Sequence, residues 1–208
     1  MFRFCYYILL ILLSHLSFGQ SFKPVGDVEK VREALRKSTN ATNSVQADFQ
    51  EEKFMAVLRE PQRSSGAFSY QKSDKMRWEQ RFPSKYIILI KGDKLRIREG
   101  AKEKNIGQAG RMASQIKDMM LGLVNGDFQD NKAFKQTIEE NPASYQITLV
   151  PVNKRMKSVY TKINLLFSKN TMRLKELTFF QKDGDKSIMK FSNERVNQGI
   201  SEDVFNVL

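Results

Sequence analysis

The chain has 208 residues, with 35 Lys and Arg against 23 Asp and Glu, and a formal net charge of +12. Its one cysteine, Cys5, and one histidine, His15, both fall in an N-terminal segment that we expect to be removed. The remaining chain would then have no thiol and no imidazole, which excludes Cys–His and Ser–His–Asp centres, disulfides and the usual zinc ligand sets.

Residues 1–19 have the pattern of a cleaved signal peptide. Arg3 precedes the apolar run CYYILLILL, and Ser17-Phe18-Gly19 provides a small-x-small cleavage site. The apolar run is roughly half of the ~20 residues that a membrane-spanning helix needs. We therefore predict cleavage after Gly19, export, and a mature chain of residues 20–208 that forms one domain.

Residues 24–40 are predicted to form an amphipathic helix. Asp27 is the expected N-cap, and Val28, Val31, Ala34 and Leu35 fall on one face. Five short strands are then predicted at 44–54, 65–71, 75–81, 85–91 and 93–99. In each of these strands apolar and polar residues alternate, so each should have one apolar and one polar face.

The polar faces of these strands are strongly basic. Residues 59–104 hold 13 Lys and Arg against 6 Asp and Glu. Such a field favours anionic partners without choosing among lipid headgroups, nucleic acid and acidic proteins. The aromatic residues share faces with Ile, Leu and Met rather than with the lysines, so a stacking platform for nucleic acid is not expected.

A second helix is predicted at 111–124, because Met and other apolar residues recur there at three- and four-residue spacing. Strands resume at 134–139, 144–151, 159–168, 172–181 and 187–196, with turns at Asn141-Pro142, Lys169-Asn170 and Asp183-Gly184. The tail, 201–208, is expected to form a helical turn or a closing strand.

This pattern predicts an α+β, mainly β fold: about ten antiparallel strands in a strongly curved sheet, its concave face covered by the two helices. An ordinary packed core and a ligand-holding interior both remain open. Methionine adapts to irregular apolar shapes, and its frequency in the second helix favours an apolar ligand such as an acyl chain.

Catalytic motifs are incomplete. Ser114 and Lys117 match S-x-x-K, but the S-D-N and K-T-G elements that accompany it in serine acyltransferases are absent from the sequence. Glu51-Glu52 and Glu139-Glu140 are neighbours on strands and so point to opposite faces. We predict no catalytic residue, no metal ligand and no cofactor, and hence a protein that is not an enzyme, although carboxylates far apart in the sequence could still pair in space.

Several motifs resemble those of the outer-membrane lipoprotein carrier family, LolA. They include S-V-x-A-x-F-x-Q from Ser44 to Gln50, S-x-G from Ser64 to Gly66, M-R-W-E-x-x-x-P from Met76 to Pro83 and G-D-K-L from Gly92 to Leu95. The strand Y-x-I-T-L-x-P from Tyr145 to Pro151 and a final Val-Phe pair follow in the family's order. The resemblance covers essentially the whole chain after Gly19.

This resemblance implies an incomplete antiparallel barrel in which helices form a lid over an apolar cavity. It also implies a periplasmic monomer that takes acylated lipoproteins from an inner-membrane ABC lipoprotein-release complex and hands them to an outer-membrane acceptor, with no nucleic acid and no bond made or broken. The same fold carrying or sensing other envelope lipids or glycolipids is the alternative.

By the same resemblance, two sets of residues are expected to line the acyl-chain cavity. The sheet would contribute Ala47, Phe49, Phe68, Tyr70, Met76, Trp78, Ile88 and Ile90, and the lid would contribute Met112, Ile116, Met119, Met120 and Leu123. Well-known members latch the lid with an Arg-Pro pair, where this chain has Lys72-Ser73. Lys72 is the candidate latch, although lysine does not provide the planar fork of arginine.

Overall fold

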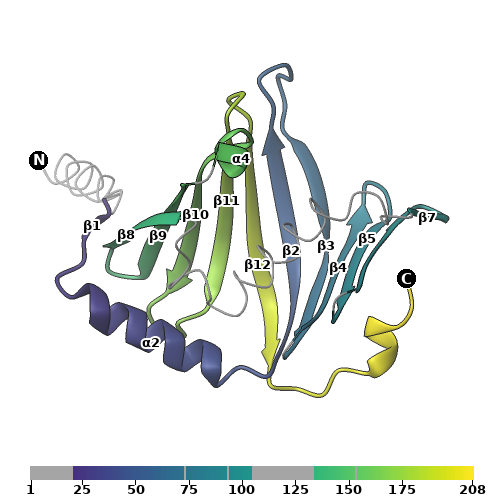
Figure 1. The fold of residues 1–208 in the computed structure, drawn as a ribbon, viewed down its shortest axis with the longest axis horizontal. Coiled ribbons are helices and arrows are strands. Elements are labelled where there is room, and N and C mark those ends of the chain that lie inside the picture. The colour runs from purple at the N-terminus through teal and green to yellow at the C-terminus, as the bar shows by residue number, and fades with distance from the viewer. Residues whose placement is uncertain (1–20, 73, 93, 105–133, 153) are drawn as a thin grey trace, which may run out of the picture.

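Strands dominate the computed structural model, which describes residues 21–72, 74–92, 94–104, 134–152 and 154–208 (Figure 1). The predicted signal peptide and the predicted helix at 111–124 lie outside these residues. Within the described ranges, twelve strands form one antiparallel sheet in the order β1-β8-β9-β10-β11-β12-β2-β3-β4-β5-β6-β7. Their bounds are β1 Lys23–Pro24, β2 Ser44–Phe54, β3 Gln62–Gln71, β4 Lys75–Phe82, β5 Tyr86–Lys91, β6 Lys94–Glu99, β7 Lys102–Lys104, β8 Phe134–Glu140, β9 Ser144–Pro151, β10 Tyr160–Ser168, β11 Leu174–Gln181 and β12 Lys186–Val196.

The sheet curves strongly but does not close, because its first and last strands, β1 and β7, do not pair with each other. The C-terminal strand β12 lies at its centre and joins the two halves through its pairing with β2, where Phe191 is opposite Phe49. Figure 1 shows the two halves of the sheet on either side of β12 and β2. The expected fold class, a mainly β, open antiparallel barrel, is confirmed.

Most strand positions agree with the alternation of the sequence, and β2 has the predicted bounds. The predicted helix at 24–40 begins four residues later than expected, at Val28. Pro24 instead belongs to β1, where it pairs with Glu139 of β8. Two further elements were not predicted: the edge strand β7 and the short helix α4, Lys154–Lys157.

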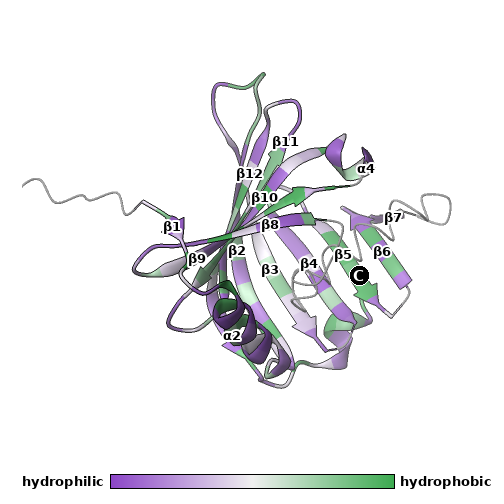
Figure 2. Ribbon diagram, turned by 60° about the vertical axis from the view of Figure 1, so that its left-hand side comes forward, coloured by the Kyte–Doolittle hydropathy of each residue, from purple (hydrophilic) through white to green (hydrophobic). Residues whose placement is uncertain are grey.

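Helix α2, Val28–Asn40, crosses one end of the sheet below β9 to β11 in Figure 1. The Asp27 side chain caps its first turn by accepting a hydrogen bond of 3.0 Å from the Lys30 amide, as predicted. Val31 and Leu35 are buried, and Figure 2 shows the apolar stripe of the helix facing the strands. Among the described residues, no helix combines the length and hydropathy that crossing a bilayer requires.

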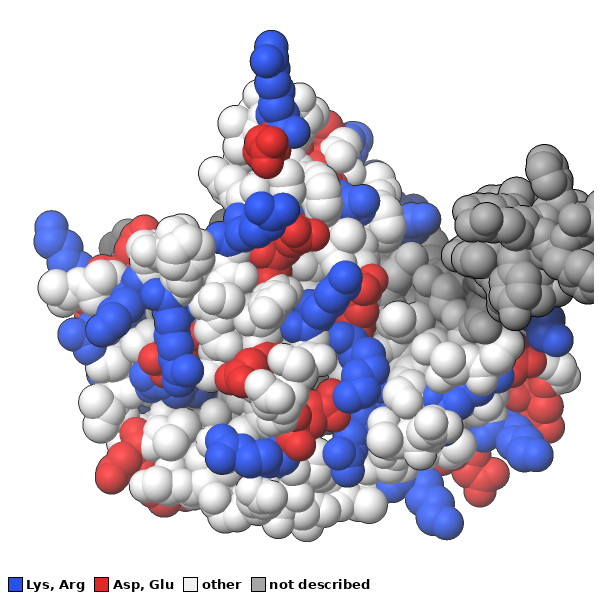
Figure 3. All heavy atoms as spheres, turned by 180° about the vertical axis from the view of Figure 1, so that it is seen from behind, with Lys and Arg blue, Asp and Glu red and all other residues white. Residues whose placement is uncertain are grey.

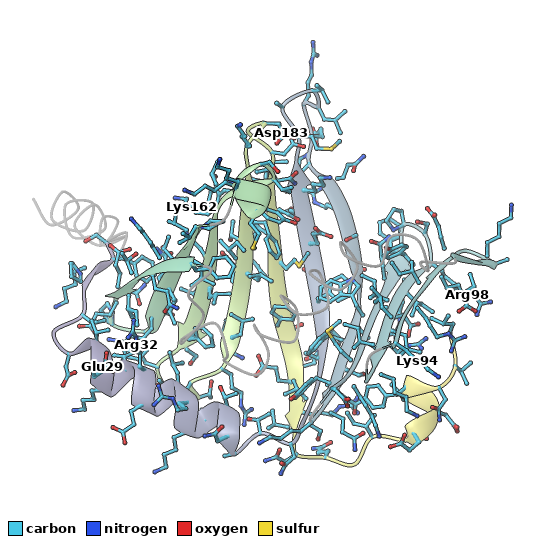
Figure 4. The ribbon with its side chains drawn as sticks, viewed as in Figure 1. Glu29, Arg32, Lys94, Arg98, Lys162 and Asp183 are labelled. Carbon is cyan, nitrogen blue, oxygen red and sulfur yellow. The ribbon has the colours of Figure 1, made fainter. Side chains whose placement is uncertain are left out.

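The exposed face of α2 is held by local polar contacts. Arg32 Nη1 donates to Glu29 Oε1 at 3.1 Å, one turn apart, and both residues lie in the N-terminal half of the helix (Figure 4). Val28, which was expected on the buried face, is 38% exposed because it lies in the first turn, before the helix reaches the sheet. The helix is therefore anchored by its second and third turns, where each fully buried aliphatic side chain contributes roughly 1.5–3 kcal/mol.

Two groups of buried side chains make up the core. Val31 and Leu35 of α2 pack with apolar residues of β8 to β11, which form the first group. The second is mainly aromatic and lies on the concave face of β2 to β5; it comprises Phe49, Phe68, Tyr70, Met76, Trp78 and Ile90. Met189 and Phe191 of β12 pack against both groups, so the central strand connects the two parts of the core.

The C-terminal segment covers the convex face of β4 to β6. It contains the 3₁₀ helix η2, Glu202–Phe205, whose Phe205 is only 1% exposed. Phe205 and Leu89 line one small hollow, so the outward-facing apolar residues of β5 are covered by the tail. This explains why residues 86–90 are apolar at consecutive positions rather than alternating.

Much of the basic polar face is engaged by this same tail. Arg77 donates to the Val204 and Val207 carbonyls, and Arg96 Nη1 donates to the Asn206 carbonyl at 3.1 Å. Lys75 pairs with Glu202, and Arg98 donates to the Leu208 carbonyl beside the C-terminus (Figure 4). On the side turned away in Figure 1, Lys and Arg are interspersed with Asp and Glu (Figure 3). A large part of the positive charge therefore serves intramolecular contacts.

Candidate apolar binding cavity

The concave face holds a cavity of about 290 Å³, walled by β2 to β5, by β10 to β12 and by α2. Fifteen of the twenty described residues that line it are apolar. The lining consists of Leu35, Ser38, Thr39, Thr42, Val45, Ala47, Phe68, Met76, Trp78, Ile88, Phe167, Met172, Arg173, Leu174, Leu177, Phe179, Met189, Phe191, Glu194 and Val196. This volume is close to the ~300 Å³ at which ligand pockets begin.

Strand register explains why one half of this wall is continuous. Ala47 is opposite Phe68, Phe68 is opposite Trp78, and Trp78 is opposite Ile88. Cross-strand partners always point to the same face, so these four side chains form one row across β2 to β5. Bands of alternating hydropathy along β3 to β6 in Figure 2 show the same arrangement.

Three aromatic rings form the centre of the wall. Phe68, Trp78 and Phe191 have ring centroids 6.2 to 6.4 Å apart and meet edge to face. Phe49 stacks on Trp78 with a centroid distance of 3.8 Å. Such pairs contribute about 0.5–1.5 kcal/mol each beyond their burial, so this part of the wall is held firmly in shape.

The sheet residues predicted for the cavity fall into two sets. Ala47, Phe68, Met76, Trp78 and Ile88 are in the lining. Phe49, Tyr70 and Ile90 are buried in the aromatic core group that supports the wall. The five predicted lid residues, Met112, Ile116, Met119, Met120 and Leu123, lie outside the described residues.

The part of the lining that comes from β10 to β12 and α2 was not predicted from the sequence. Met189 and Phe191, like Phe167, carry the same two-residue alternation that identified the first half, and this signal could have found them. Met172 lies in the β10–β11 turn, and a register shift between Leu174 and Glu176 interrupts the alternation between Leu174 and Leu177. Leu35 was predicted to be buried in the helix, but its place in the cavity depends on how α2 crosses the sheet.

The polar lining residues gather at one end, where α2, the β10–β11 turn and β12 meet. Glu194 has a side chain only 9% exposed, with Lys175 Nζ 2.9 Å from its Oε1 and Arg173 Nη1 3.9 Å from its Oε2. Ser38 Oγ donates to the Met172 carbonyl at 3.5 Å, which joins the helix to this cluster. The cavity is therefore amphipathic, with a charged end and an aromatic wall.

Lys72, the candidate latch, contacts the end of α2. Its Nζ donates to the carbonyl of Asn40, the last helical residue, at 3.2 Å, and its amide donates to the Asn43 carbonyl at 2.8 Å. A cation at a helix C-terminus satisfies an unpaired carbonyl and interacts favourably with the helix dipole. Lys72 thus ties α2 to the end of β3, next to the cavity.

The lining of this site suits an apolar ligand. The described part of the chain has no cluster of three or more His, Cys, Asp or Glu residues that could hold a metal ion. An acyl chain entering the cavity would gain roughly 0.8 kcal/mol for each CH₂ removed from water. Fold and site together define a class: an open, curved antiparallel barrel whose concave face holds an apolar cavity.

Comparison with known proteins identifies the family. The family model described as "Outer membrane lipoprotein carrier protein LolA" matches residues 40–207, and the chain belongs to this family. It is similar to the outer-membrane lipoprotein carrier proteins of two Coxiella burnetii strains. Identity is 30% for strain CbuK_Q154 and 29% for strain RSA 331 / Henzerling II, in each case over 163 residues, or 77% of this chain and 74% of the relative.

Solved structures agree at the level of the fold. The crystal structure of MucB is similar with a TM-score of 0.50 at 14% sequence identity, over 87% of this chain and 62% of the other. At this identity the likeness concerns only the arrangement of the chain. The resemblance found in the sequence motifs is confirmed by the family match.

Proposed function

We propose that this protein is a periplasmic carrier that binds the acyl chains of lipoproteins in its concave cavity and ferries them from the inner membrane to the outer membrane. The observation that carries the proposal is the cavity of about 290 Å³ with its row of apolar and aromatic side chains. Membership of the LolA family, and curated relatives named as outer-membrane lipoprotein carriers, support it.

The physical task is to shield hydrocarbon from water without binding it permanently. Burial of one long chain offers ~10 kcal/mol before ordering costs, at roughly 0.8 kcal/mol per CH₂. Part of this gain is offset by the loss of ligand freedom on binding. Release to a membrane or to a second apolar cavity restores the same burial, so transfer can proceed close to equilibrium and requires no bond to be made or broken.

The route and the partners belong to the proposal. Export by cleavage after Gly19 would deliver residues 20–208, as a single carrier domain, to the periplasm. There it would take acylated lipoproteins from an inner-membrane ABC complex and pass them to an outer-membrane acceptor. The LolA family match supports this assignment of partners.

Ala47, Phe68, Met76, Trp78 and Ile88 are the sheet residues that we propose contact the acyl chain, since all five line the cavity. Residues of β10 to β12 would complete the contact surface. Lys72 would act as a latch on α2, through its bond to the Asn40 carbonyl. That bond restrains one wall of the cavity, so it opposes the widening that a ligand larger than the empty cavity needs.

Two cavity variants with opposite chemistry test the proposal. Met76→Glu places a carboxylate among apolar side chains, and Ala47→Leu adds apolar volume without charge; Met76 is 0% exposed and Ala47 6%. Val57→Glu, at a position 86% exposed in the β2–β3 loop, is the matched control. Each variant is incubated with a purified acylated lipoprotein, and the lipoprotein that stays soluble without detergent is measured.

We expect Val57→Glu to retain the wild-type capacity and both cavity variants to lose most of it. A buried carboxylate in Met76→Glu can also disturb folding, so the circular dichroism spectra of both variants are compared with that of the wild type. Ala47→Leu introduces no charge, so it tests the cavity even if Met76→Glu does not fold. Full capacity in Ala47→Leu together with Met76→Glu would refute the site. Mass spectrometry of lipid that copurifies from the native compartment separates lipoprotein from the alternative, other envelope lipids or glycolipids.

A further inference from the structure

A charged cluster at the end of the apolar cavity has no role in acyl-chain binding as such. Glu194 and Arg173 line the cavity, and Lys175 lies beside them on β11. A carboxylate that is only 9% exposed is costly next to hydrocarbon unless it is paired. Its presence in the wall therefore needs an explanation of its own.

A bulge in β12 turns Glu194 into the cavity. Between Ser192 and Arg195 the β12–β2 register shifts, so that Asn193 and Glu194 together face Ala47. Asn193 takes the left-handed conformation with φ of 53°, which asparagine tolerates better than most residues. Strict alternation from Met189 and Phe191 would have turned Asn193 and Arg195 inward instead. The bulge reverses this order and puts a carboxylate in the lining.

The two cations are not equivalent. Lys175 Nζ lies 2.9 Å from Glu194 Oε1, within hydrogen-bond distance, and neutralises the carboxylate. Arg173 Nη1 lies 3.9 Å from Oε2, too far for a hydrogen bond, although the two cationic side chains are equally exposed, at 41%. The cluster thus carries a net charge of +1, and the guanidinium keeps donors available for another acceptor.

The neighbouring hydroxyl groups cannot take the same role. Thr39 Oγ1 donates to the Leu35 carbonyl at 3.0 Å, and Thr42 Oγ1 donates to the Ser38 carbonyl at 2.8 Å. Since a hydroxyl has one proton to donate, both threonines can only accept a further bond. Among the described lining side chains at this end, Arg173 therefore offers the available charged donor.

We propose that Arg173, with Lys175, forms an anion-binding subsite for the carboxylate or phosphate at the polar end of an acyl-chain ligand. The proposal rests on the proposed function, because it assumes that the cavity takes the hydrocarbon part. The guanidinium fork matches both anions in a two-bond geometry. The ligand is then bound in one direction, with its chain along the aromatic wall and its anionic group between α2 and β12.

The test compares four amphiphiles with the same twelve-carbon chain: dodecanoate, dodecyl phosphate, dodecyl maltoside and dodecyltrimethylammonium. Binding below the micelle concentration is followed by the fluorescence of Trp78, which lines the cavity and is the one tryptophan of the sequence. The variants are Arg173→Gln and Glu194→Gln. Arg59→Gln, an exposed position in the β2–β3 loop, is the control because it removes the same charge elsewhere.

For the wild type we expect both anions to bind roughly five- to tenfold more tightly than the maltoside, and the cation to bind most weakly. This ratio corresponds to the contribution of one partly exposed charge-assisted hydrogen bond. Arg173→Gln should abolish this preference, so that the anions and the maltoside bind with similar affinity. Glu194→Gln should strengthen anion binding, because it removes the competing carboxylate, and Arg59→Gln should match the wild type.

Equal affinities for all four amphiphiles, or an anion preference that persists in Arg173→Gln, would overturn the subsite and leave the carrier proposal standing. Absence of binding by every amphiphile would overturn both. Inorganic phosphate serves as a further arm. We expect inorganic phosphate to displace neither dodecanoate nor the maltoside. Displacement of dodecanoate but not of the maltoside would show that the site binds free anions rather than a headgroup.

Discussion

Gly66 of β3 lies directly against the backbone of β4, and replacing it with alanine should be among the most destabilising small changes in the chain. A Cβ at this position would be 1.9 Å from the Glu79 carbonyl oxygen and 2.8 Å from Gln80 Cα, both backbone atoms. The register between the strands shifts at this point, from Ser65 opposite Phe82 to Gly66 opposite Gln80. No side-chain rotation can relieve a contact between a Cβ and the backbone.

The size of the effect follows from the distance that must be gained. Moving the oxygen from 1.9 Å to at least 3.0 Å separates the strands by more than about 1 Å at that point. Ladder hydrogen bonds near 2.9 Å would then exceed bonding distance. Losing about two of them, at roughly 0.5–1.5 kcal/mol each plus the cost of leaving buried groups unpaired, gives about 3 kcal/mol.

Urea unfolding followed by tryptophan fluorescence measures this change. Gly199→Ala is the control, since a Cβ there meets nothing within 4 Å, and its free energy of unfolding should stay within ~0.5 kcal/mol of the wild type. Thermal unfolding of Gly66→Ala should shift down by roughly 6–12 °C. Equal stability of the two alanine variants would refute the assignment of a steric requirement to Gly66.

Two further predictions concern the ends of α2 and of the chain. Lys72→Met removes the hydrogen bond to the Asn40 carbonyl and should lower the free energy of unfolding by about 0.3–1 kcal/mol in the same urea assay. Lys72→Arg keeps the positive charge and should keep the wild-type stability. An equal loss of stability in both variants would contradict the role of Lys72 at the helix end. The pKa of Glu202 is held below its ordinary value, first by the hydrogen bond from Lys75 and then by the charges of Lys75 and Lys91. Because the folded-state pKa is the lower one, the stabilisation is present above the ordinary carboxyl pKa and is lost as the pH falls through the lowered pKa. NMR titration should show the Glu202 pKa returning toward its ordinary value in Lys75→Gln but not in Lys182→Gln, and an unchanged pKa in Lys75→Gln would contradict the pairing.

The tail changes how the charge of this protein is interpreted. From the sequence, the basic face of β4 to β6 indicates an anionic partner. In the structure, Arg77 and Arg96 donate to carbonyls of the C-terminal segment, which covers this face. The partner for much of this charge is therefore the protein's own backbone, whereas Arg173 is the cation among the described residues that line the cavity, on the other side of the sheet.

Local patterns determined most of the secondary structure. The alternation that runs from Ser44 to Phe54 gave β2 its correct bounds, and Asp27 was correctly predicted as the cap of α2. Alternation also placed Phe68 and Trp78 on one face, because the strand period is two and does not depend on the rest of the fold. The motifs then led to the family, and the family to the open barrel with an apolar cavity.

Only the tertiary structure decided where the polar end of the cavity lies. A bulge in β12 and a register shift between β10 and β11 bring Glu194, Arg173 and Lys175 together. Neither irregularity was predicted from the alternation of apolar and polar residues along the chain. The crossing of α2 over the sheet likewise depends on packing against β8 to β11. Periodicity is a property of neighbouring residues, whereas a bulge is stabilised by contacts between strands that are distant in sequence, as with Asn193 and Asp48.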